Sequence, residues 1–407
     1  KLRRALRGSG YRMPFFGTLS GDYAQIGGGL AQNSCGLGKG HLAEHVRALE
    51  VVLGDGRVVR TGSDAAANSG PFDRHYGPDL TGLFLSDSGA LGVKTRATLA
   101  LEVEPGGTSF GSWAFDDVRA LVTTQVEIAR RGLAVECVAS DAYLAQAMTK
   151  MPPPPARELW EMVRGYVAGR RGKLRAIRQV LRAARPLSFL KDVPFVLGVA
   201  ADAFDQAASD RLIAEAHRIA RRAGGRRLPP ALPLGMRHGP LPPVADLMIG
   251  LGGESNFPSN IIVPLSKALR AVEELDRYFS EQRATMRAHG IFEARNYLTA
   301  GSAFGIEPIL YWRSRPSAWR LSFVTDEAKR RELEAIPENP AATAAAVEIR
   351  HGMIMRLREL GAVQIQLGKL YPYRASLGDG PTWHLLQSLK RVVDPAGVLN
   401  PGTLGLD

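Results

Sequence analysis

Three consecutive glycines near the start of the chain are followed closely by small polar residues. The segment contains Gly27, Gly28, Gly29, Asn33, Ser34 and Gly36. Glycines without a Cβ let backbone N–H groups approach a diphosphate that side chains would otherwise exclude. Asn33 and Ser34 could add short polar contacts. The segment also fits a glycine-rich β-turn with no ligand, and the pattern alone does not choose between these interpretations.

Two later segments have a similar character. Residues 86–95 include Ser88, Gly89, Gly92 and Val93, and their small side chains permit a tight turn with backbone groups facing a ligand. Near the end of the chain, Asn400 lies in the motif DPAGVLNPG, residues 394–402. A plain terminal turn is the alternative explanation of this last motif.

The order and separation of these three segments, with a hairpin between the first two, resemble a known flavoprotein family. This is the vanillyl-alcohol oxidase / p-cresol methylhydroxylase (PCMH-type) superfamily, which includes glycolate and D-lactate dehydrogenase-like proteins. The resemblance is close over residues 19–103 and 363–407, and architectural between them. It implies that the cofactor is FAD and that the three segments line it, through Gly27, Gly28, Gly29, Asn33, Ser34, Gly36, Ser88, Gly89, Gly92 and Val93, with Asn400 returning toward the flavin.

Two departures from the family pattern affect what we expect. The FAD domain of the family begins with a strand–helix–strand unit and another glycine-rich loop, and nothing before Gly27 supplies either, so we expect an N-terminally truncated sequence. Metal-binding family members carry paired histidines beside the substrate. None of the eight histidines forms such a pair with a carboxylate in the matching place, so we expect no metal site.

Other cofactor motifs are excluded by their spacing. The segment 36–41, GLGKGH, lacks the Ser or Thr that follows Lys in a phosphate-binding loop, and it lacks the GxGxxG spacing of a nicotinamide site. The two cysteines, Cys35 and Cys137, form neither a disulfide framework nor a CxxC motif. Nothing therefore argues against a reducing, cytoplasmic location.

The best substrate-site candidates lie in the segment 364–374. Lys369 and Arg374 could bind a carboxylate or phenolate, and Tyr371 and Tyr373 could orient or deprotonate a hydroxyl. A strand end with amphipathic aromatic residues explains the same pattern. We add Glu307, before Pro308, as a candidate buried acid, for which a structural carboxylate is the alternative. Tyr311 and Arg313 alternate on the same expected strand and could face the flavin.

The rest of the chain predicts two domains in a soluble protein. A chain of 407 residues is longer than one ordinary hydrophobic core accommodates. It contains no uninterrupted run of about 18 apolar residues that could span a membrane. The net charge of +12 includes a segment, 164–191, with nine cations and no acid. A basic amphipathic helix there could contact an anionic membrane surface, whereas a solvated helix is the simpler explanation. No recognised fold supports nucleic-acid binding.

Glycine, proline and periodicity signals give the expected elements. A hairpin turning at Asp55-Gly56 joins strands 48–53 and 57–61, and another strand covers 92–101. Strand and helix then alternate: strands 112–115, 134–139, 195–200, 309–312, 320–324 and 363–367, and helices after Asp116, over 205–223, from Ser266 and over 383–393. We predict an α+β fold with an antiparallel sheet covered by helices on one side.

The predicted organisation is an FAD-binding domain over 1–103, a substrate or cap domain over 104–370, and a C-terminal segment 371–407 that returns to the FAD domain. By resemblance, the protein is an FAD-dependent oxidoreductase that oxidises a small hydroxylated substrate by hydride transfer to flavin N5. A 2-hydroxy acid such as D-lactate or glycolate is favoured. The alternatives are a phenol or aryl alcohol, an alkyl-glycerone-phosphate synthase-like transferase, and a non-catalytic remnant. A cytochrome, quinone or oxygen would accept the electrons, and a homo-oligomer is possible.

Overall fold

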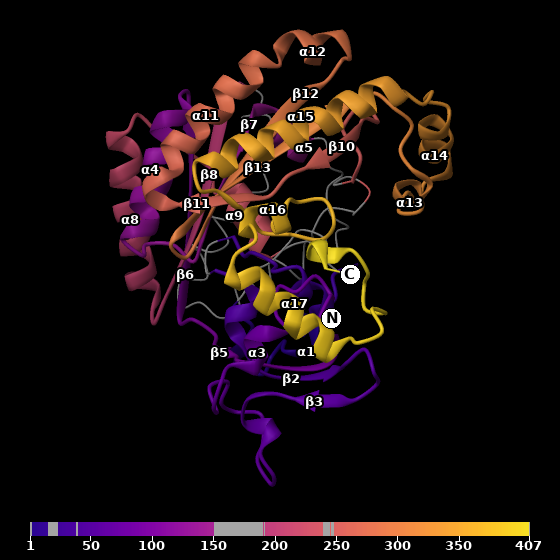
Figure 1. Cartoon of the computed structure of the whole chain (residues 1–407). Coiled ribbons are helices and arrows are strands. Elements are labelled where there is room, and N and C mark those ends of the chain that lie inside the picture. Colours follow the sequence, from indigo (N-terminus) through magenta and orange to yellow (C-terminus); the bar gives the residue numbers. More distant parts are fainter. Residues whose placement is uncertain are drawn as a thin grey trace.

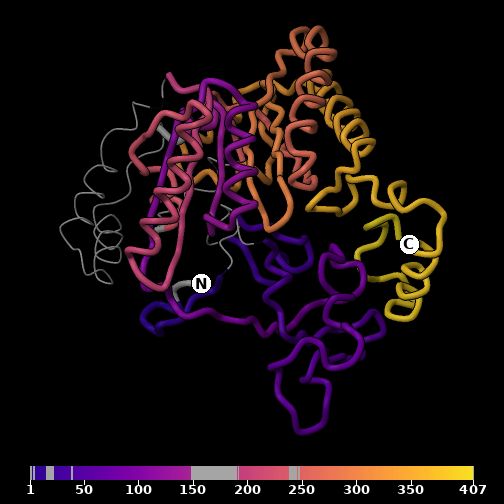
Figure 2. The backbone as a smooth tube through the Cα atoms, turned by 90° about the vertical axis from the view of Figure 1, so that its left-hand side faces the viewer, coloured from indigo at the N-terminus to yellow at the C-terminus, as the bar shows by residue number. Residues whose placement is uncertain are grey.

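The computed structural model describes residues 2–14, 23–37, 40–149, 190, 192–238, 245 and 248–406. The basic segment 164–191 and the Pro-rich segment 152–155 therefore lie outside the described residues, apart from Leu190. Figure 1 shows a broad upper lobe of sheet and helices above a smaller lower lobe. Figure 2, turned by 90°, shows the first hundred residues and the yellow C-terminal segment together beneath the upper lobe.

A three-stranded antiparallel sheet organises the lower lobe. Its strands, in the order β3-β2-β4, are β2 (Val46–Val52), β3 (Val58–Arg60) and β4 (Val93–Leu99). The predicted hairpin is confirmed, because β2 and β3 pair and Gly56 adopts the positive φ of 85° that this tight turn requires. Val51 and Leu49 on β2 are buried with Leu30, Phe84 and Val393 in a separate core.

Short helices surround this small sheet. They are α2 (Ile26–Ala31), α3 (Leu80–Leu83) and, from the far end of the chain, α17 (Pro381–Val393). The glycine triplet was expected in a turn, and the structure corrects this, because Gly27, Gly28 and Gly29 all lie inside α2. Helix α17 buries Trp383, Lys390 and Val393, so the predicted C-terminal helix is confirmed and belongs to the lower lobe.

The upper lobe contains one nine-stranded antiparallel sheet. Eight strands follow the order β14-β11-β13-β12-β7-β8-β6-β9, and β10 extends the edge by pairing with β13. The strands are β6 (Gly107–Phe115), β7 (Glu136–Asp141), β8 (Phe195–Ala203), β9 (Arg226–Leu228), β10 (Ser255–Pro258), β11 (Ile261–Pro264), β12 (Phe292–Ala300), β13 (Ala303–Trp312) and β14 (Val363–Gln364).

Four helices cover one face of this sheet. They are α4 (Val118–Arg130), α8 (Gln206–Arg222), α11 (Ala268–Glu281) and α15 (Pro340–Glu359), which Figure 1 shows along its outer side. Each presents an apolar stripe at helical spacing, as Leu121, Val122 and Ile128 do on α4. These stripes enclose the main core with the alternate strand residues Tyr297, Phe304 and others. The predicted antiparallel sheet with helices packed on it is confirmed, but the helices are not confined to one side. The helices α5 (Ala142–Thr149) and α9 (Ala231–His238) pack on the other face, where Ala145 and Leu232 contact a small core with Ala114 and Val196.

Three details of the predicted elements are wrong. Residues 320–324 form no strand, because Ser317 caps the short helix α13 (Ala318–Leu321). Helix α4 is capped by Asp117 and not by Asp116, since the Asp117 carboxylate accepts a hydrogen bond from the Ala120 N–H. The strand expected over 363–367 is limited to β14, two residues at the sheet edge.

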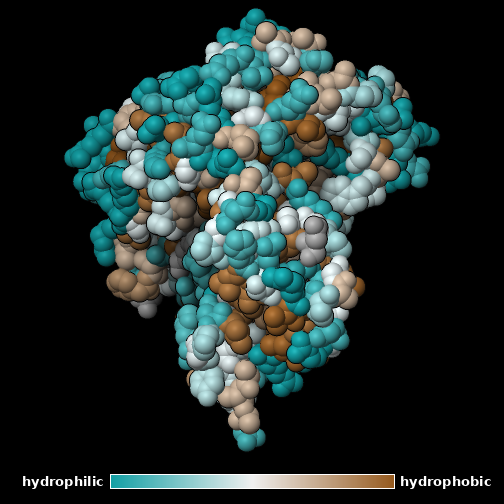
Figure 3. All heavy atoms as spheres, viewed as in Figure 1, coloured by the Kyte–Doolittle hydropathy of each residue, from teal (hydrophilic) through white to brown (hydrophobic). Residues whose placement is uncertain are grey.

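Apolar side chains gather on the outward side of α17, where Figure 3 shows a brown area over the lower lobe. Leu385, Val392 and Val398 are each more than 60% exposed there. Across the described part of the chain, the structure contains no helix long and apolar enough to cross a membrane.

Candidate cofactor and substrate site

The first two glycine-containing segments meet in the lower lobe. The Ser86 N–H donates to the Leu30 carbonyl oxygen at 2.8 Å, and the Ser88 N–H donates to the Ala31 carbonyl oxygen at 2.8 Å. The loop 86–92 is therefore hydrogen-bonded to the last turn of α2, although more than 50 residues separate them. A shared backbone surface, on which the flavin hypothesis depends, requires this convergence.

The C-terminal motif joins the same point. The Asn400 side-chain amide donates to the Ser88 carbonyl oxygen at 2.7 Å, and the Gly368 N–H donates to Ser88 Oγ at 3.0 Å. Buried Ser88 therefore joins three chain segments. Its N–H and carbonyl groups bond the first segment and Asn400, and its hydroxyl accepts from Gly368.

Each of the three segments contains at least one non-glycine residue with a left-handed backbone. The φ angles are 51° at Asn33, 59° at Ser86, 50° at Ser88 and 40° at Asn400. L-residues rarely adopt this region, and such conformations are held by surrounding contacts and gather at functional sites. Three of the predicted cofactor-binding residues therefore share an unusual backbone that neighbouring segments stabilise.

The three glycines of α2 differ in what surrounds them. A Cβ on Gly29 would lie 2.9 Å from Leu42 Cδ2, and one on Gly27 would lie 3.7 Å from the Lys94 carbonyl oxygen. A Cβ on Gly28 would meet nothing within 4 Å. Gly29 is thus explained by packing, whereas Gly28 leaves an open backbone surface of the kind a cofactor can approach.

The remaining predicted cofactor residues contribute mainly to local structure. Gly36 is buried and its N–H donates to the Gly40 carbonyl oxygen at 2.7 Å, while the Ser34 N–H donates to the Gly29 carbonyl oxygen at 2.9 Å. A Cβ on Gly92 would lie 2.2 Å from Val51 Cγ1, so Gly92 allows the loop to pack on β2. Val93 is exposed at the start of β4.

Gly89 completes the loop beside the C-terminal motif. It has a φ of 76°, its N–H donates to Asp87 Oδ1 at 3.0 Å, and a Cβ there would lie 3.8 Å from Asn400 Nδ2. The left-handed backbone accounts for the glycine, and its position beside Asn400 agrees with a role in the shared surface.

Two buried ion pairs, which the sequence analysis missed, hold this loop from opposite sides. Lys94 Nζ lies 2.6 Å from Asp87 Oδ1, with both side chains almost fully buried. On α17, the buried Lys390 ammonium contacts the Asp394 carboxylate, and this outweighs burial to lower the Asp394 pKa. The one available signal was the i,i+4 spacing of Lys390 and Asp394 at a helix end.

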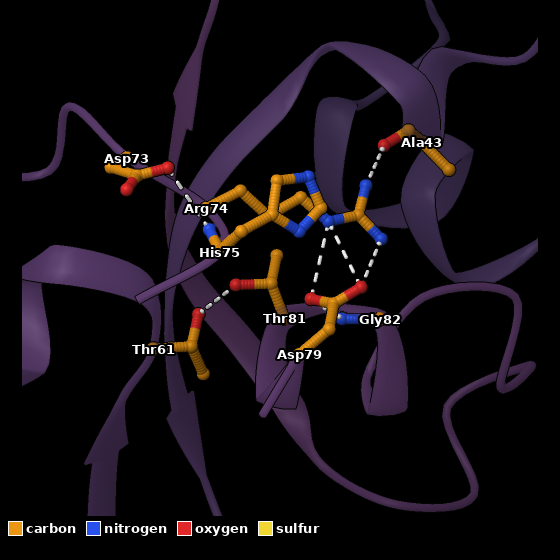
Figure 4. A network of polar contacts seen from close by, with 8 residues as sticks. All are labelled: Ala43, Thr61, Asp73, Arg74, His75, Asp79, Thr81 and Gly82. Carbon is orange, nitrogen blue, oxygen red and sulfur yellow. Dashed lines mark hydrogen bonds and ion pairs between the residues drawn. The ribbon is translucent and has the colours of Figure 1, made fainter. Parts of the chain in front are cut away.

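A polar network joins residues 74–82, which precede the second segment, to Ala43, which follows the first (Figure 4). Asp79 caps α3 by accepting from the Gly82 N–H at 2.8 Å, and Arg74 Nη2 donates to Asp79 Oδ2 at 2.8 Å. Arg74 Nη1 also donates to the Ala43 carbonyl oxygen at 3.0 Å. Hydrogen bonds from Arg74 therefore lower the pKa of Asp79 and hold residues 74–82 next to Ala43.

The first glycine segment also reaches the large sheet. The Cys137 N–H on β7 donates to the Leu37 carbonyl oxygen at 2.6 Å. Elsewhere Arg12 Nη1 lies 2.5 Å from Asp202 Oδ2 on β8. Because Asp202 alternates with Ala201, which lies on the side of α4, α8, α11 and α15, this contact lies on the opposite face of the sheet. The lower lobe thus meets this opposite face.

Glu307 lies on that opposite face, since its neighbour Ile306 belongs to the core beneath α4, α8, α11 and α15. Asn296 Nδ2 donates to Glu307 Oε2 at 2.8 Å, and Ser140 Oγ donates to Asn296 Oδ1 at 2.7 Å. Burial raises the pKa of Glu307, partly opposed by the Asn296 hydrogen bond. The chain of Ser140, Asn296 and Glu307 presents an oriented carboxyl group that can accept a proton.

An aromatic cluster stands on the same strands. The rings of Tyr143, Phe292 and Tyr311 lie 5.0–5.1 Å apart between centroids. Burial, followed by the nearby Tyr143 and Glu307, raises the pKa of Tyr311, so its hydroxyl stays protonated. Arg313, which we expected to accompany Tyr311, is exposed and donates to the Gly252 carbonyl oxygen at 3.3 Å.

The four candidates in the segment 364–374 do not form one cluster of free groups. The Tyr371 hydroxyl accepts from Arg350 Nη2 at 3.2 Å and from the Asn260 N–H at 3.3 Å. Tyr373 packs against the small core containing Trp383, and burial raises its pKa. Arg374 stacks on Trp383 and pairs with Asp379, whereas Lys369 is exposed. Within the described ranges, no group of three or more His, Cys, Asp or Glu could hold a metal ion.

With this geometry established, comparisons with known proteins define the class. The profile described as the FAD binding domain matches residues 1–62, and that of the C-terminal domain of FAD linked oxidases matches residues 372–404. The mitochondrial D-lactate dehydrogenase [cytochrome] 1 of Saccharomyces cerevisiae is 29% identical over 121 residues, 29% of this chain and 20% of that protein. The alditol oxidase of a Streptomyces species is 32% identical over 162 residues, 39% of this chain and 32% of that protein.

Structural comparison agrees on the fold. The 4-ethylphenol oxidase of Gulosibacter chungangensis superposes with a TM-score of 0.68 at 17% identity, covering all of this chain and 74% of that one. The fold is that of PCMH-type flavoproteins. Two segments of the chain match profiles of FAD-linked oxidases, and both profiles indicate FAD as the cofactor. The chain spans a third or less of the two curated relatives described above.

The residues present fit FAD. The space beside Gly28 is open, and a Cβ there would occupy room that a cofactor needs. Loop 86–92 and Asn400 converge on the end of the same helix. Backbone groups and an amide side chain suit a diphosphate, and no carboxylate among the described contacts of Gly28 would repel it. We propose that Gly28, Gly89 and Asn400 would take part in holding the cofactor.

Proposed function

We propose that this chain is an FAD-dependent oxidoreductase that oxidises a small hydroxylated molecule, with a 2-hydroxy acid such as D-lactate or glycolate as first candidate. In this proposal residues 1–103 and 371–407 bind the cofactor, and residues 104–370 carry the substrate side of the site. The observation that carries the proposal is the oriented Glu307 carboxyl on the sheet face that meets the cofactor-binding lobe.

Oxidation of an alcohol requires removal of a proton from oxygen and of a hydride from carbon. Bound FAD supplies the hydride acceptor. Glu307 takes the hydroxyl proton, and its raised pKa makes it a stronger base than an exposed glutamate. Asn296 and Ser140 keep the carboxyl oriented by donating in sequence toward it.

This assignment changes the roles we expected in the segment 364–374. The Tyr371 hydroxyl is occupied by Arg350, and burial raises the pKa of Tyr373, which makes Tyr373 a poor proton acceptor. We assign substrate-anion binding to Lys369, which is exposed and follows Gly368, the residue bonded to Ser88. Electrons then pass to a cytochrome, a quinone or oxygen.

A phenolic or aryl-alcohol substrate is the second candidate. The observation that favours it is the aromatic cluster of Tyr143, Phe292 and Tyr311, close to Glu307 on the same sheet face. Aromatic rings recognise another ring by offset or edge contacts. A 2-hydroxy acid would gain more from Lys369, so variants of these two groups distinguish the candidates.

The decisive experiment is anaerobic titration of the FAD-loaded protein with D-lactate, glycolate and 4-hydroxybenzyl alcohol while the flavin absorbance is followed. Bleaching by one class is expected, and Glu307→Gln should slow it by about 10²–10⁴-fold, the usual contribution of a general base. Lys369→Met should impair the acids alone, whereas Tyr311→Leu should impair the aryl alcohol alone. Persistent absorbance with every substrate, in a protein that holds FAD, would reject the dehydrogenase assignment.

A further inference from the structure

Besides Lys94, a second buried ammonium group stands where the three cofactor-site segments meet. Lys390, on the inner side of α17, is 2% exposed. Its Nζ donates to the Ala90 carbonyl oxygen at 3.0 Å, to the Leu399 carbonyl oxygen at 2.8 Å and to the Asp394 carboxylate. These three acceptors use all three N–H donors of a lysine.

The Asp394 carboxylate is equally committed. It is buried and, besides Lys390, accepts from the Val398 N–H at 3.0 Å and the Leu399 N–H at 2.9 Å. Removing one member of a buried pair leaves an unpaired charge, which costs far more than an exposed pair contributes. The ion pair thus forces the turn 394–399 and the Ala90 region of the loop to stay in contact with α17.

What the ion pair holds in place is an unfavourable backbone. Ser86 and Ser88 have φ angles of 59° and 50°, and Asn400, which donates to the Ser88 carbonyl, has one of 40°. Residues in this region persist only when neighbouring contacts over-determine them. Lys390 restrains both sides, through Ala90 two residues after Ser88 and through Leu399 directly before Asn400.

From these contacts we infer that Lys390 is a positioning residue of the flavin site. It sets the backbone of 86–92 and the direction of Asn400 without contacting the cofactor itself. FAD affinity in this chain accordingly depends on a buried cation at the C-terminal end of α17. The inference rests on FAD binding but not on which substrate is oxidised.

The test compares Lys390→Met with Arg295→Met in the full chain. Arg295 is a matched control because it is also a buried cation, 8% exposed and paired with Glu293 at 2.7 Å, but lies on the helix side of β12. Three quantities are measured for each: the FAD dissociation constant by flavin fluorescence, hydrogen exchange of residues 86–92, and urea unfolding. Asp394→Asn provides a milder variant that retains the Lys390 contacts to Ala90 and Leu399.

Lys390→Met should weaken FAD binding at least about tenfold, equivalent to about 1.4 kcal/mol, and should accelerate exchange in 86–92. Asp394→Asn should weaken binding less, and Arg295→Met should lower stability while leaving FAD affinity and exchange in 86–92 unchanged. Equal loss of affinity in the Arg295 control, or unchanged affinity and exchange in the Lys390 and Asp394 variants, would overturn the inference. If Lys390→Met fails to fold, Asp394→Asn decides by the same two readouts.

These readouts separate two kinds of failure. A parent chain that binds no FAD while Lys390→Met still accelerates exchange in 86–92 contradicts the cofactor assignment and supports the positioning contact. A parent chain that binds FAD with an affinity indifferent to Lys390→Met and Asp394→Asn contradicts the positioning role and supports the cofactor assignment.

Discussion

Individual carboxyl groups in this protein illustrate how their surroundings determine their chemistry. Asp394 and Asp79 have lowered pKa values because lysine or arginine and backbone N–H groups donate to them. Glu307 and Asp141 have raised values because burial is not compensated by a cation to the same degree. Asp141 is also the residue whose titration should be visible in the stability of the whole chain.

Burial raises the pKa of Asp141 to about 6, although the N–H groups of Leu144 and Arg295 donate to its carboxylate. The unfolded value is the ordinary 3.8. Between these pH values the folded state binds more protons, so stability rises as pH falls from about 6 toward about 4. As pH falls over this range, the free energy of unfolding of the parent should increase by roughly 1–3 kcal/mol relative to that of Asp141→Asn, which has no titrating group at this position.

Urea unfolding of the parent and Asp141→Asn at pH 7.5, 6 and 4.5 measures this difference. Other titrating groups are common to both proteins and cancel in the comparison. A constant difference across the three pH values would show that Asp141 titrates normally in the folded state.

At this scale the sequence predicted residue types better than partners. Glu307 could be selected because an acid followed by proline in an apolar strand is unusual. Its partner Asn296 could not, because their contact depends on the register between β12 and β13, which pairs Asn296 with Glu307. Tyr371 was selected for its chemistry, and only the packing of α15 revealed that Arg350 occupies its hydroxyl.

Helix α2 is a short element whose glycines disfavour a helix but leave backbone exposed for a cofactor. It contains three glycines among its six residues, although glycine is the least favourable ordinary residue in a helix apart from proline. Contacts with other segments stabilise it, including the hydrogen bonds from Ser86 and Ser88 to its last carbonyls. Sequence patterns predicted a turn here because glycine triplets rarely form helices without such tertiary support.

Replacing each glycine with alanine separates the two explanations for these glycines, which are close packing and approach of the cofactor. Gly28→Ala should raise the free energy of unfolding by roughly 0.5–1 kcal/mol, since alanine favours a helix and its Cβ meets nothing within 4 Å. The same Cβ would occupy the surface proposed for FAD, so its dissociation constant should rise. Gly29→Ala should instead lower stability, because its Cβ would lie 2.9 Å from Leu42 Cδ2.

Urea unfolding without FAD and fluorescence titration with FAD provide both numbers for each variant. A Gly28→Ala protein that binds FAD as tightly as the parent would remove this glycine from the cofactor surface. The hairpin β2–β3 needs no comparable test, because its Asp-Gly turn specified it from local sequence alone.

The whole molecule depends on how the lower lobe is attached to the large sheet. Sequence periodicity predicted helices α4, α8 and α11 and strands β6, β7 and β8, because each presents a regular apolar stripe, but it missed α15 and β12. The lobe that the segment 371–407 joins was expected only from the family resemblance, since it depends on buried polar contacts such as Lys390 with Ala90. The attachment of β1 (Tyr11–Arg12) to the sheet is likewise carried by charge and not by apolar periodicity.

Asp202 is the centre of this attachment. Its carboxylate lies 2.5 Å from Arg12 of the lower lobe and 3.2 Å from Arg237 Nη2, and Thr108 Oγ1 donates to it at 2.8 Å. Burial raises the pKa of Asp202, but Arg237 and Arg12 outweigh this and lower it. The stabilisation is therefore present above the unfolded pKa of 3.8 and is lost as pH falls through the lower folded value.

Replacing Asp202 by alanine leaves two neighbouring arginines without their common partner. We expect the free energy of unfolding to fall by roughly 3–5 kcal/mol at pH 7, as for other broken buried pairs, and amide exchange of residues 11–12 to accelerate. Asp116→Ala is the control, because the Asp116–Arg226 pair is exposed on both sides (70% and 58%) and such pairs contribute about 0–1 kcal/mol. If both variants lose the same small amount in urea unfolding at pH 7, the ionic contact does not couple the lobes. A large loss confined to Asp202→Ala would instead mean that the cofactor-binding lobe keeps its position against Glu307 through this one buried carboxylate and its arginines.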